Sequence, residues 1–96
     1  MATLPFETEK LIELCRQHDV TMLGVFGSVA RNEATEDSDI DLLVRFSQQK
    51  SLLTLIRLER EVSALLDRDV DLVTEGALSP YLRDQVNQEL RIIYEA

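Results

Sequence analysis

The stretch GSVARNEATEDSDIDLLV, residues 27–44, decides the fold of this chain. Its end, IDLLV, is typical of a buried strand, yet Asp39 and Asp41 stand one residue apart where that strand begins. Side chains alternate along a strand, so the two aspartates share one face, while Ile40 and Leu42 point to the other. Two carboxylates on one face repel each other. The pattern therefore predicts that a bound cation offsets this repulsion.

A second strand repeats the arrangement in DRDVDLV, residues 67–73, where Asp69 and Asp71 share a face. If the two strands pair, an acidic cluster forms at one end of a sheet. The register of VDLV against IDLLV favours Asp71 over Asp69 as the working carboxylate. Mg²⁺ takes oxygen ligands and leaves positions open for substrate phosphates. Two such ions, about 4 Å apart, can hold the attacking and leaving oxygens of an in-line displacement.

Gly27 and Ser28 supply a complementary anion site, because they follow the apolar run VTMLGVF. Gly27 permits a tight turn or a close approach to a ligand. Ser28 would open a short helix whose free N–H groups favour an anion such as a triphosphate. Arg31, one helical turn later, could reach a phosphate, or it could be a surface cation that pairs with Glu33 or Glu36. The two interpretations of Arg31 stay open at this point.

The periodicity along the chain predicts a single domain over residues 1–96, with strands alternating with helices. Ser51 and Ser79 are candidate N-caps, and Pro80 suits a first helical position. The order α-β-α-β-α-β-α indicates an α/β (α+β) fold in which helices flank a small mixed sheet. The expected elements are a helix over 7–18, a strand over 20–27, a short helix from Ser28, a strand over 39–46, a helix over 51–66, a strand over 69–74 and a helix over 78–96.

Composition restricts the possible functions. The 96 residues carry a net charge of −8, which argues against strong nucleic-acid binding because phosphate contacts need clustered Lys and Arg. The apolar runs are too short to span a membrane, and the start lacks the features of a signal peptide, so we expect a cytoplasmic protein. The lone Cys15 is expected to be a buried free thiol, and the lone His18 is expected to be structural.

One known family matches this set of residues. Gly27-Ser28, ten intervening residues and then Asp39-Ile40-Asp41 resemble the signature of the DNA polymerase β-like nucleotidyltransferase superfamily. The flanking FGSVAR and SDIDLLV resemble its minimal nucleotidyltransferase (MNT) branch, which consists of small antitoxins paired with HEPN-domain toxins. The resemblance extends over nearly the whole chain, since DVDLV and the segment after it also resemble the family.

The resemblance implies a polymerase β-like fold and Mg²⁺-dependent transfer of a nucleoside monophosphate. Asp39 and Asp41 would be metal ligands, and Asp71 would help to activate the attacking hydroxyl and share one of two Mg²⁺ ions. Gly27 and Ser28 would hold the β- and γ-phosphates. The resemblance further implies that AMP passes from ATP to a tyrosine of the partner HEPN toxin, which silences its RNase.

Two alternative functions remain open from the sequence. In the first, the chain is a non-catalytic antitoxin that neutralises a toxin by covering its active site. In the second, the chain is a nucleotidyltransferase whose acceptor is a small molecule or an RNA end. The acidic surface disfavours RNA, and the lack of residues for an acceptor-binding domain disfavours both acceptors. The preference for ATP over other triphosphates is also left open.

Overall fold

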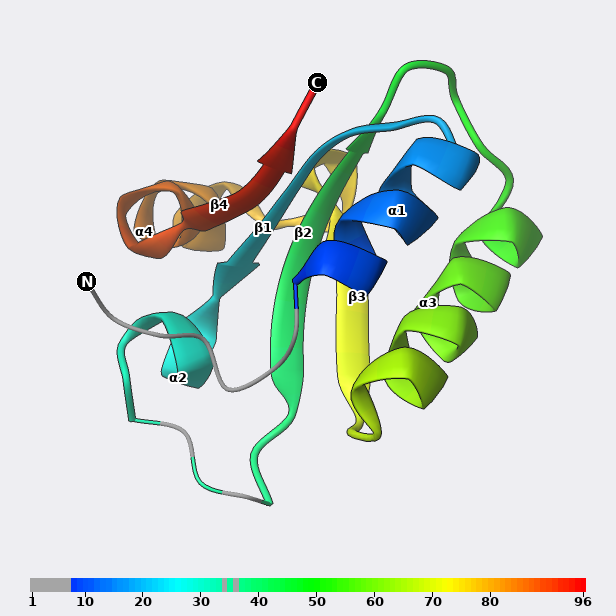
Figure 1. Ribbon diagram of the computed structural model, residues 1–96. Coiled ribbons are helices and arrows are strands. Elements are labelled where there is room, and N and C mark those ends of the chain that lie inside the picture. Colours follow the sequence, from blue (N-terminus) through cyan, green and yellow to red (C-terminus); the bar gives the residue numbers. More distant parts are fainter. Residues whose placement is uncertain (1–7, 34, 36) are drawn as a thin grey trace.

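A computed structural model of the protein, which describes residues 8–33, 35 and 37–96, contains a four-stranded sheet in the order β3-β2-β1-β4 (Figure 1). β1 is antiparallel to both of its neighbours, whereas β2 and β3 are parallel. The sheet is therefore mixed, which confirms the predicted fold class. The strands are β1 (Val20–Phe26), β2 (Ile40–Phe46), β3 (Val70–Thr74) and β4 (Arg91–Glu95).

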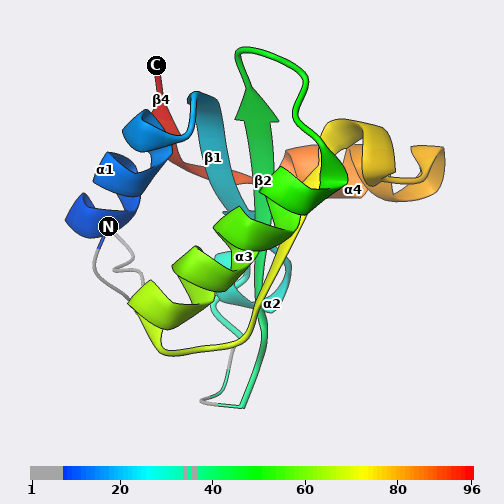
Figure 2. The ribbon, with the colours of Figure 1, turned by 90° about the vertical axis from the view of Figure 1, so that its right-hand side faces the viewer.

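The helices cover the two faces of the sheet unequally. Figure 2 shows α1 and α3 on one side of the sheet and α4 on the other. The short helix α2 directly follows β1, and the 3₁₀ turn η1 follows β3. The bounds are α1 (Glu9–Gln17), α2 (Gly27–Ala30), α3 (Leu52–Leu66), η1 (Glu75–Ala77) and α4 (Pro80–Glu89). No helix among the described residues has the length and apolar character needed to cross a membrane.

The alternation of side chains in β2 separates two apolar clusters. Leu42 and Val44 belong to the larger cluster, which lies between the sheet and helices α1 and α3. Leu43 belongs to a smaller cluster with Met22 and with Val86 of α4. Because side chains two residues apart share a face, Asp41 lies on the α4 side of the sheet with Leu43. The larger apolar cluster thus occupies one face, and Asp41 lies beside the smaller cluster on the other.

Hydroxyl caps start the two longer helices where the sequence predicts them. The Ser51 hydroxyl accepts a hydrogen bond from the Thr54 N–H at 3.2 Å, and the Ser79 hydroxyl accepts one from the Leu82 N–H at 3.4 Å. Pro80 is the first residue of α4. α3 ends at Asp67, whose left-handed backbone (φ 53°) turns the chain toward β3.

The two isolated residues of chemical interest have structural surroundings. Cys15 is a buried free thiol, as predicted, and burial raises the pKa of the Cys15 thiol to about 11. His18 Nε2 lies 2.9 Å from Glu61 Oε2, so it connects the end of α1 to α3. These contacts agree with the structural role that was expected for His18.

The predicted helix over 78–96 is wrong in its second half. α4 ends at Glu89, and residues 91–95 form β4, which pairs with β1. Ile92, Ile93 and Tyr94 are residue types that favour strands, and the open edge of β1 supplies their hydrogen-bond partners. Gly24 makes room for this change of direction, because a Cβ there would lie 2.5 Å from Leu90 Cδ1. The order is therefore α-β-α-β-α-β-α-β.

Candidate active site

The acidic residues lie at the edge of the sheet where the parallel strands β2 and β3 begin. Asp41 of β2 is paired directly with Asp71 of β3, so their side chains share one face on neighbouring strands. The Ile40 N–H donates a hydrogen bond to the Asp69 carbonyl at 2.9 Å, which joins the two strands at their starts. Asp39 directly precedes β2 and is exposed. The predicted pairing of the two acidic strands is confirmed.

The charges of these carboxylates act on one another. Partial burial and the negative charges of Asp71 and Asp39 raise the pKa of the Asp41 carboxyl, while the charge of Arg31 opposes this shift. Three carboxylates are hard oxygen donors, and a divalent cation between them would relieve their repulsion. The donor set therefore fits Mg²⁺ in charge and chemistry. Among the described residues, however, no three His, Cys, Asp or Glu side chains lie close enough together to bind one metal ion.

Gly27 lies against Asp41. It follows Phe26, which is paired with Asp41 across β1 and β2, and it has a left-handed backbone with φ 74°. A Cβ on Gly27 would lie only 2.4 Å from Asp41 Oδ2. Only glycine adopts this conformation without strain and leaves this space to the carboxylate. The structure thus shows a close approach of Gly27 to the Asp41 side chain, whereas the sequence predicted a tight turn or a close approach to a ligand.

A pocket of about 320 Å³ brings together four of the predicted site residues. Gly27, Ser28, Arg31 and Asp41 line it, and residues of α4 close it from the opposite side, including Gln85 and Glu89. The remaining lining residues are the apolar Phe26, Leu78, Leu82 and Val86.

Asp39 does not line the pocket that contains Asp41. It lines a second pocket, of about 510 Å³, together with Asp69, Arg68 and the turn after α3. Arg68 uses one guanidinium nitrogen, Nη2, to donate hydrogen bonds to the carbonyls of Thr35 at 2.8 Å and Ser38 at 2.6 Å. This arginine holds the loop that leads into Asp39, a role that the sequence analysis missed.

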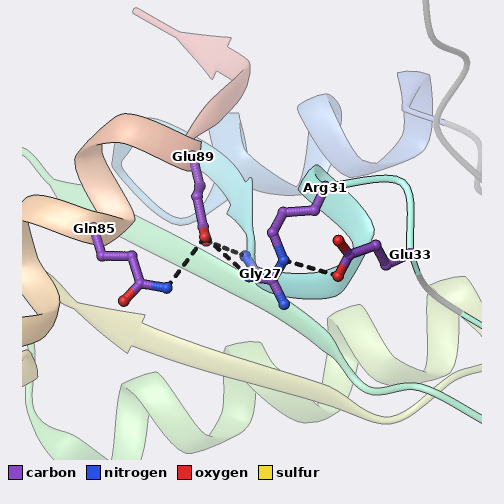
Figure 3. A network of polar contacts seen from close by, with 5 residues as sticks. All are labelled: Gly27, Arg31, Glu33, Gln85 and Glu89. Atoms are coloured by element: carbon purple, nitrogen blue, oxygen red, sulfur yellow. Dashed lines mark hydrogen bonds and ion pairs between the residues drawn. The ribbon is translucent and has the colours of Figure 1, made fainter.

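Arg31 is part of a polar network that extends to α4 (Figure 3). Its Nε lies 3.1 Å from Glu33 Oε2, as in the surface-pair interpretation, and its Nη1 lies 2.9 Å from Glu89 Oε1. The same Glu89 oxygen accepts a hydrogen bond from Gln85 Nε2 at 3.2 Å, and Oε2 accepts one from the Gly27 N–H at 3.3 Å. Glu36, the other partner considered for Arg31, lies outside the described residues. Glu89 is 58 residues from Arg31, so local sequence patterns could not have revealed it.

Arg45 lies two residues beyond Leu43 in β2, on the face of the sheet that Asp41 shares. Its guanidinium forms an ion pair with Glu75 in η1. This ion pair lies at the end of β2, and Arg45 does not line the pocket of Arg31 and Asp41.

Comparison with known proteins assigns the class. Residues 9–96 match the family described as polymerase beta, nucleotidyltransferase, so the chain belongs to this nucleotidyltransferase family. Within it, the chain is a minimal nucleotidyltransferase of the MntA-like protein adenylyltransferase group. It is 45% identical over 78 residues to the protein adenylyltransferase MntA of Thermococcus cleftensis, an alignment that covers 81% of this chain and 79% of the relative.

Solved structures agree with this class. The chain is similar to a chain in a crystal structure of a toxin–antitoxin pair with AMP-PNP, with a TM-score of 0.82, 26% identity and coverage of 94% of this chain and 74% of that one. It is also similar to a chain in a structure of a tri-AMPylated HEPN toxin from Shewanella oneidensis in complex with an MNT antitoxin. That match has a TM-score of 0.72, 25% identity and coverage of 93% and 70%.

Proposed function

We propose that this chain is an antitoxin that transfers AMP from ATP to a tyrosine hydroxyl of a HEPN-domain toxin and thereby inactivates the toxin's RNase. The observation that carries this proposal is the register of Asp41 against Asp71 directly beside Gly27. The complexes of similar chains with HEPN toxins and with AMP-PNP support the choice of acceptor and donor. We place the reaction in the cytoplasm, where ATP is available.

In the proposed reaction the tyrosine oxygen attacks the α-phosphorus of ATP. A new O–P bond forms, the bond from the α-phosphorus to the bridging oxygen breaks, and pyrophosphate leaves with the electron pair. Asp71, which is exposed to solvent on the edge strand β3, would accept the proton of the attacking hydroxyl. Such a transfer depends on positioning and on neutralising charge rather than on covalent chemistry of the protein.

The remaining site residues would bind the nucleotide. Gly27, Ser28 and Arg31 line the pocket beside Asp41 and offer N–H, hydroxyl and guanidinium donors to the β- and γ-phosphates. Asp39, Asp41 and Asp71 would hold two Mg²⁺ ions, which would neutralise the charge of the triphosphate when bound. Asp39, which lines the second pocket just before the same strand, would turn toward Asp41 to join them.

The test is label transfer from α-³²P-ATP, with Mg²⁺, to the cognate HEPN-domain toxin. We expect a toxin mass increase in steps of one AMP, and a loss of transfer of at least about a hundredfold in Asp41→Asn and in Asp71→Asn. Asp84→Asn, which removes the same charge from an exposed position on α4, is the matched control and should transfer normally. Undiminished transfer in both site variants would overturn the assignment.

The same variants separate modification from neutralisation by binding. If an Asp39→Ala, Asp41→Ala double variant protects cells from the toxin as well as the unmodified chain does, the chain acts by covering the toxin. If protection is lost while the complex still forms in size-exclusion chromatography, the chemistry is required.

A further inference from the structure

Glu89 has an unusual position for an acidic residue. It is the last residue of α4, and only 17% of its side chain is exposed although the chain carries a net charge of −8. Both of its oxygens accept hydrogen bonds, Oε2 from the Gly27 N–H and Oε1 from Arg31 and Gln85. Figure 3 shows the carboxylate of Glu89 between Gln85 on one side and Gly27 with Arg31 on the other.

Two of these three donors are the groups that the proposed function assigns to the phosphates of ATP. A carboxylate and a phosphate are both anions that accept hydrogen bonds from backbone N–H groups and guanidinium groups. One N–H cannot serve both at full strength, and the two negative charges repel each other in the same small pocket. A triphosphate can therefore take the Gly27 N–H only if Glu89 withdraws from it, and the withdrawal also frees Nη1 of Arg31.

We infer that Glu89 occupies the place of a phosphate in the nucleotide-free protein and sets the affinity for ATP by competing for Gly27 and Arg31. This inference rests on the proposed function, since that function assigns the two donors to the nucleotide. Gln85 lies one helical turn before Glu89 on α4. The hydrogen bond from Gln85 Nε2 to Glu89 Oε1 can therefore persist when the carboxylate leaves Gly27. Glu89 is thus a positioning residue. It keeps the Gly27 N–H and the Arg31 guanidinium arranged for an anion, and the triphosphate displaces it from them.

The inference predicts that removing the charge of Glu89 has opposite effects on two properties. Glu89→Gln keeps the shape of the side chain but weakens its contact with Arg31 and its repulsion of phosphate. We expect the affinity for ATP with Mg²⁺ to increase about tenfold in isothermal titration calorimetry, and the melting temperature of the nucleotide-free protein to fall. If Glu89 had only a structural role, the substitution would lower both the melting temperature and the affinity for ATP, because a less stable site does not bind ATP more tightly.

Two further measurements make the test specific. Asp84→Asn is the matched control, since it removes one charge from the exposed side of α4, and its ATP affinity should stay within about twofold of the unmodified chain. Inorganic tripolyphosphate, titrated in place of ATP, should show the same gain in Glu89→Gln, because the competition concerns phosphate rather than the nucleobase. Glu89→Ala is the second variant and should also bind more tightly.

The outcomes distinguish this inference from the proposed function. If the unmodified chain binds ATP and Glu89→Gln binds it no more tightly than Asp84→Asn does, the inference is wrong and the function stands. If affinity rises as expected but no label reaches the toxin, the competition is real and the proposed acceptor is wrong. Failure of every variant to bind ATP would overturn both.

Discussion

At Gly27 a single missing side chain permits two features of the site. The residue has a left-handed backbone, and its Cα faces the Asp41 carboxylate so closely that a Cβ would lie 2.4 Å from Oδ2. The same residue donates its N–H to Glu89. The absence of a Cβ therefore lets Asp41 stand beside the residues proposed to bind phosphate.

Gly27→Ala should destabilise the protein by about 1–3 kcal/mol, because alanine strains the backbone there and pushes Asp41 aside. Urea denaturation monitored by circular dichroism measures this cost. Gly76→Ala is the matched control, since a Cβ at Gly76 meets no atom within 4 Å, and it should leave stability nearly unchanged. Equal stability of the two variants would show that the contact with Asp41 relaxes without cost.

Asp41→Asn should raise the melting temperature of the metal-free protein while it abolishes transfer. Burial and the charges of Asp71 and Asp39 raise the pKa of Asp41 above its ordinary value of 3.8, so the folded state holds this proton more tightly than the unfolded state does. Stability must then fall as pH rises through that range, and the ionised carboxylate is a cost at neutral pH.

Thermal melts in EDTA across pH 3–8 would check whether ionisation of Asp41 lowers the stability of the protein. The advantage of Asp41→Asn over the unmodified chain should be absent at the acidic end and should reach its full size once Asp41 is ionised. Asp84→Asn should show no comparable rise with pH. An advantage that shrinks toward neutral pH would contradict the proposed repulsion among the three aspartates.

At the scale of elements, the start of β2 depends on support from the turn after α3. The hydrogen bonds from Arg68 to the carbonyls of Thr35 and Ser38 anchor the loop that ends at Asp39. Its Nε is buried without a hydrogen-bond partner among the described residues, so the side chain keeps its position at some energetic cost. The loop and β3 are thereby held to the same turn.

Arg68→Ala should slow AMP transfer about tenfold or more through loss of order at Asp39, while ATP still binds at Gly27 and Arg31. Initial rates of label transfer and calorimetric ATP titrations would separate the two effects. Amide hydrogen exchange should rise over residues 37–39, and Arg57→Ala, at an exposed position on α3, should change neither rate nor exchange. Loss of ATP binding equal to the loss of rate would mean that Arg68 supports the whole pocket.

At the scale of the whole molecule, the parts that were predictable are those that repeat locally along the chain. The alternation of aspartates with Ile40, Leu42, Val70 and Leu72 was enough to predict two strands with an acidic face, and the structure shows that they pair. Serine caps and Pro80 correctly marked the starts of α3 and α4. β4 was not predictable in the same way, because residues 91–95 form a strand only when the distant edge of β1 is available.

In the site, too, the residues with a local sequence pattern were predictable, and those that depend on distant contacts were not. Of the six predicted site residues, four share one pocket (Gly27, Ser28, Arg31 and Asp41), while Asp39 lines another and Asp71 is paired with Asp41 across the strands. Glu89 and Arg68 were missed, because their contacts join residues about 30 to 60 positions apart and depend on the finished fold. Nothing in the sequence around Glu89 indicates that its carboxylate accepts a hydrogen bond from the Gly27 N–H.

The three residues 67–69 that link α3 to β3 carry a constraint of length. Neighbouring positions in a strand face opposite ways, so one residue more or fewer in this link would bring either a valine or a leucine alongside Asp41. The acidic face would lose its third carboxylate and the core would gain a charge, even though no residue of the site had been replaced. Deletions and insertions in this short link should therefore be as damaging as substitution of the aspartates themselves.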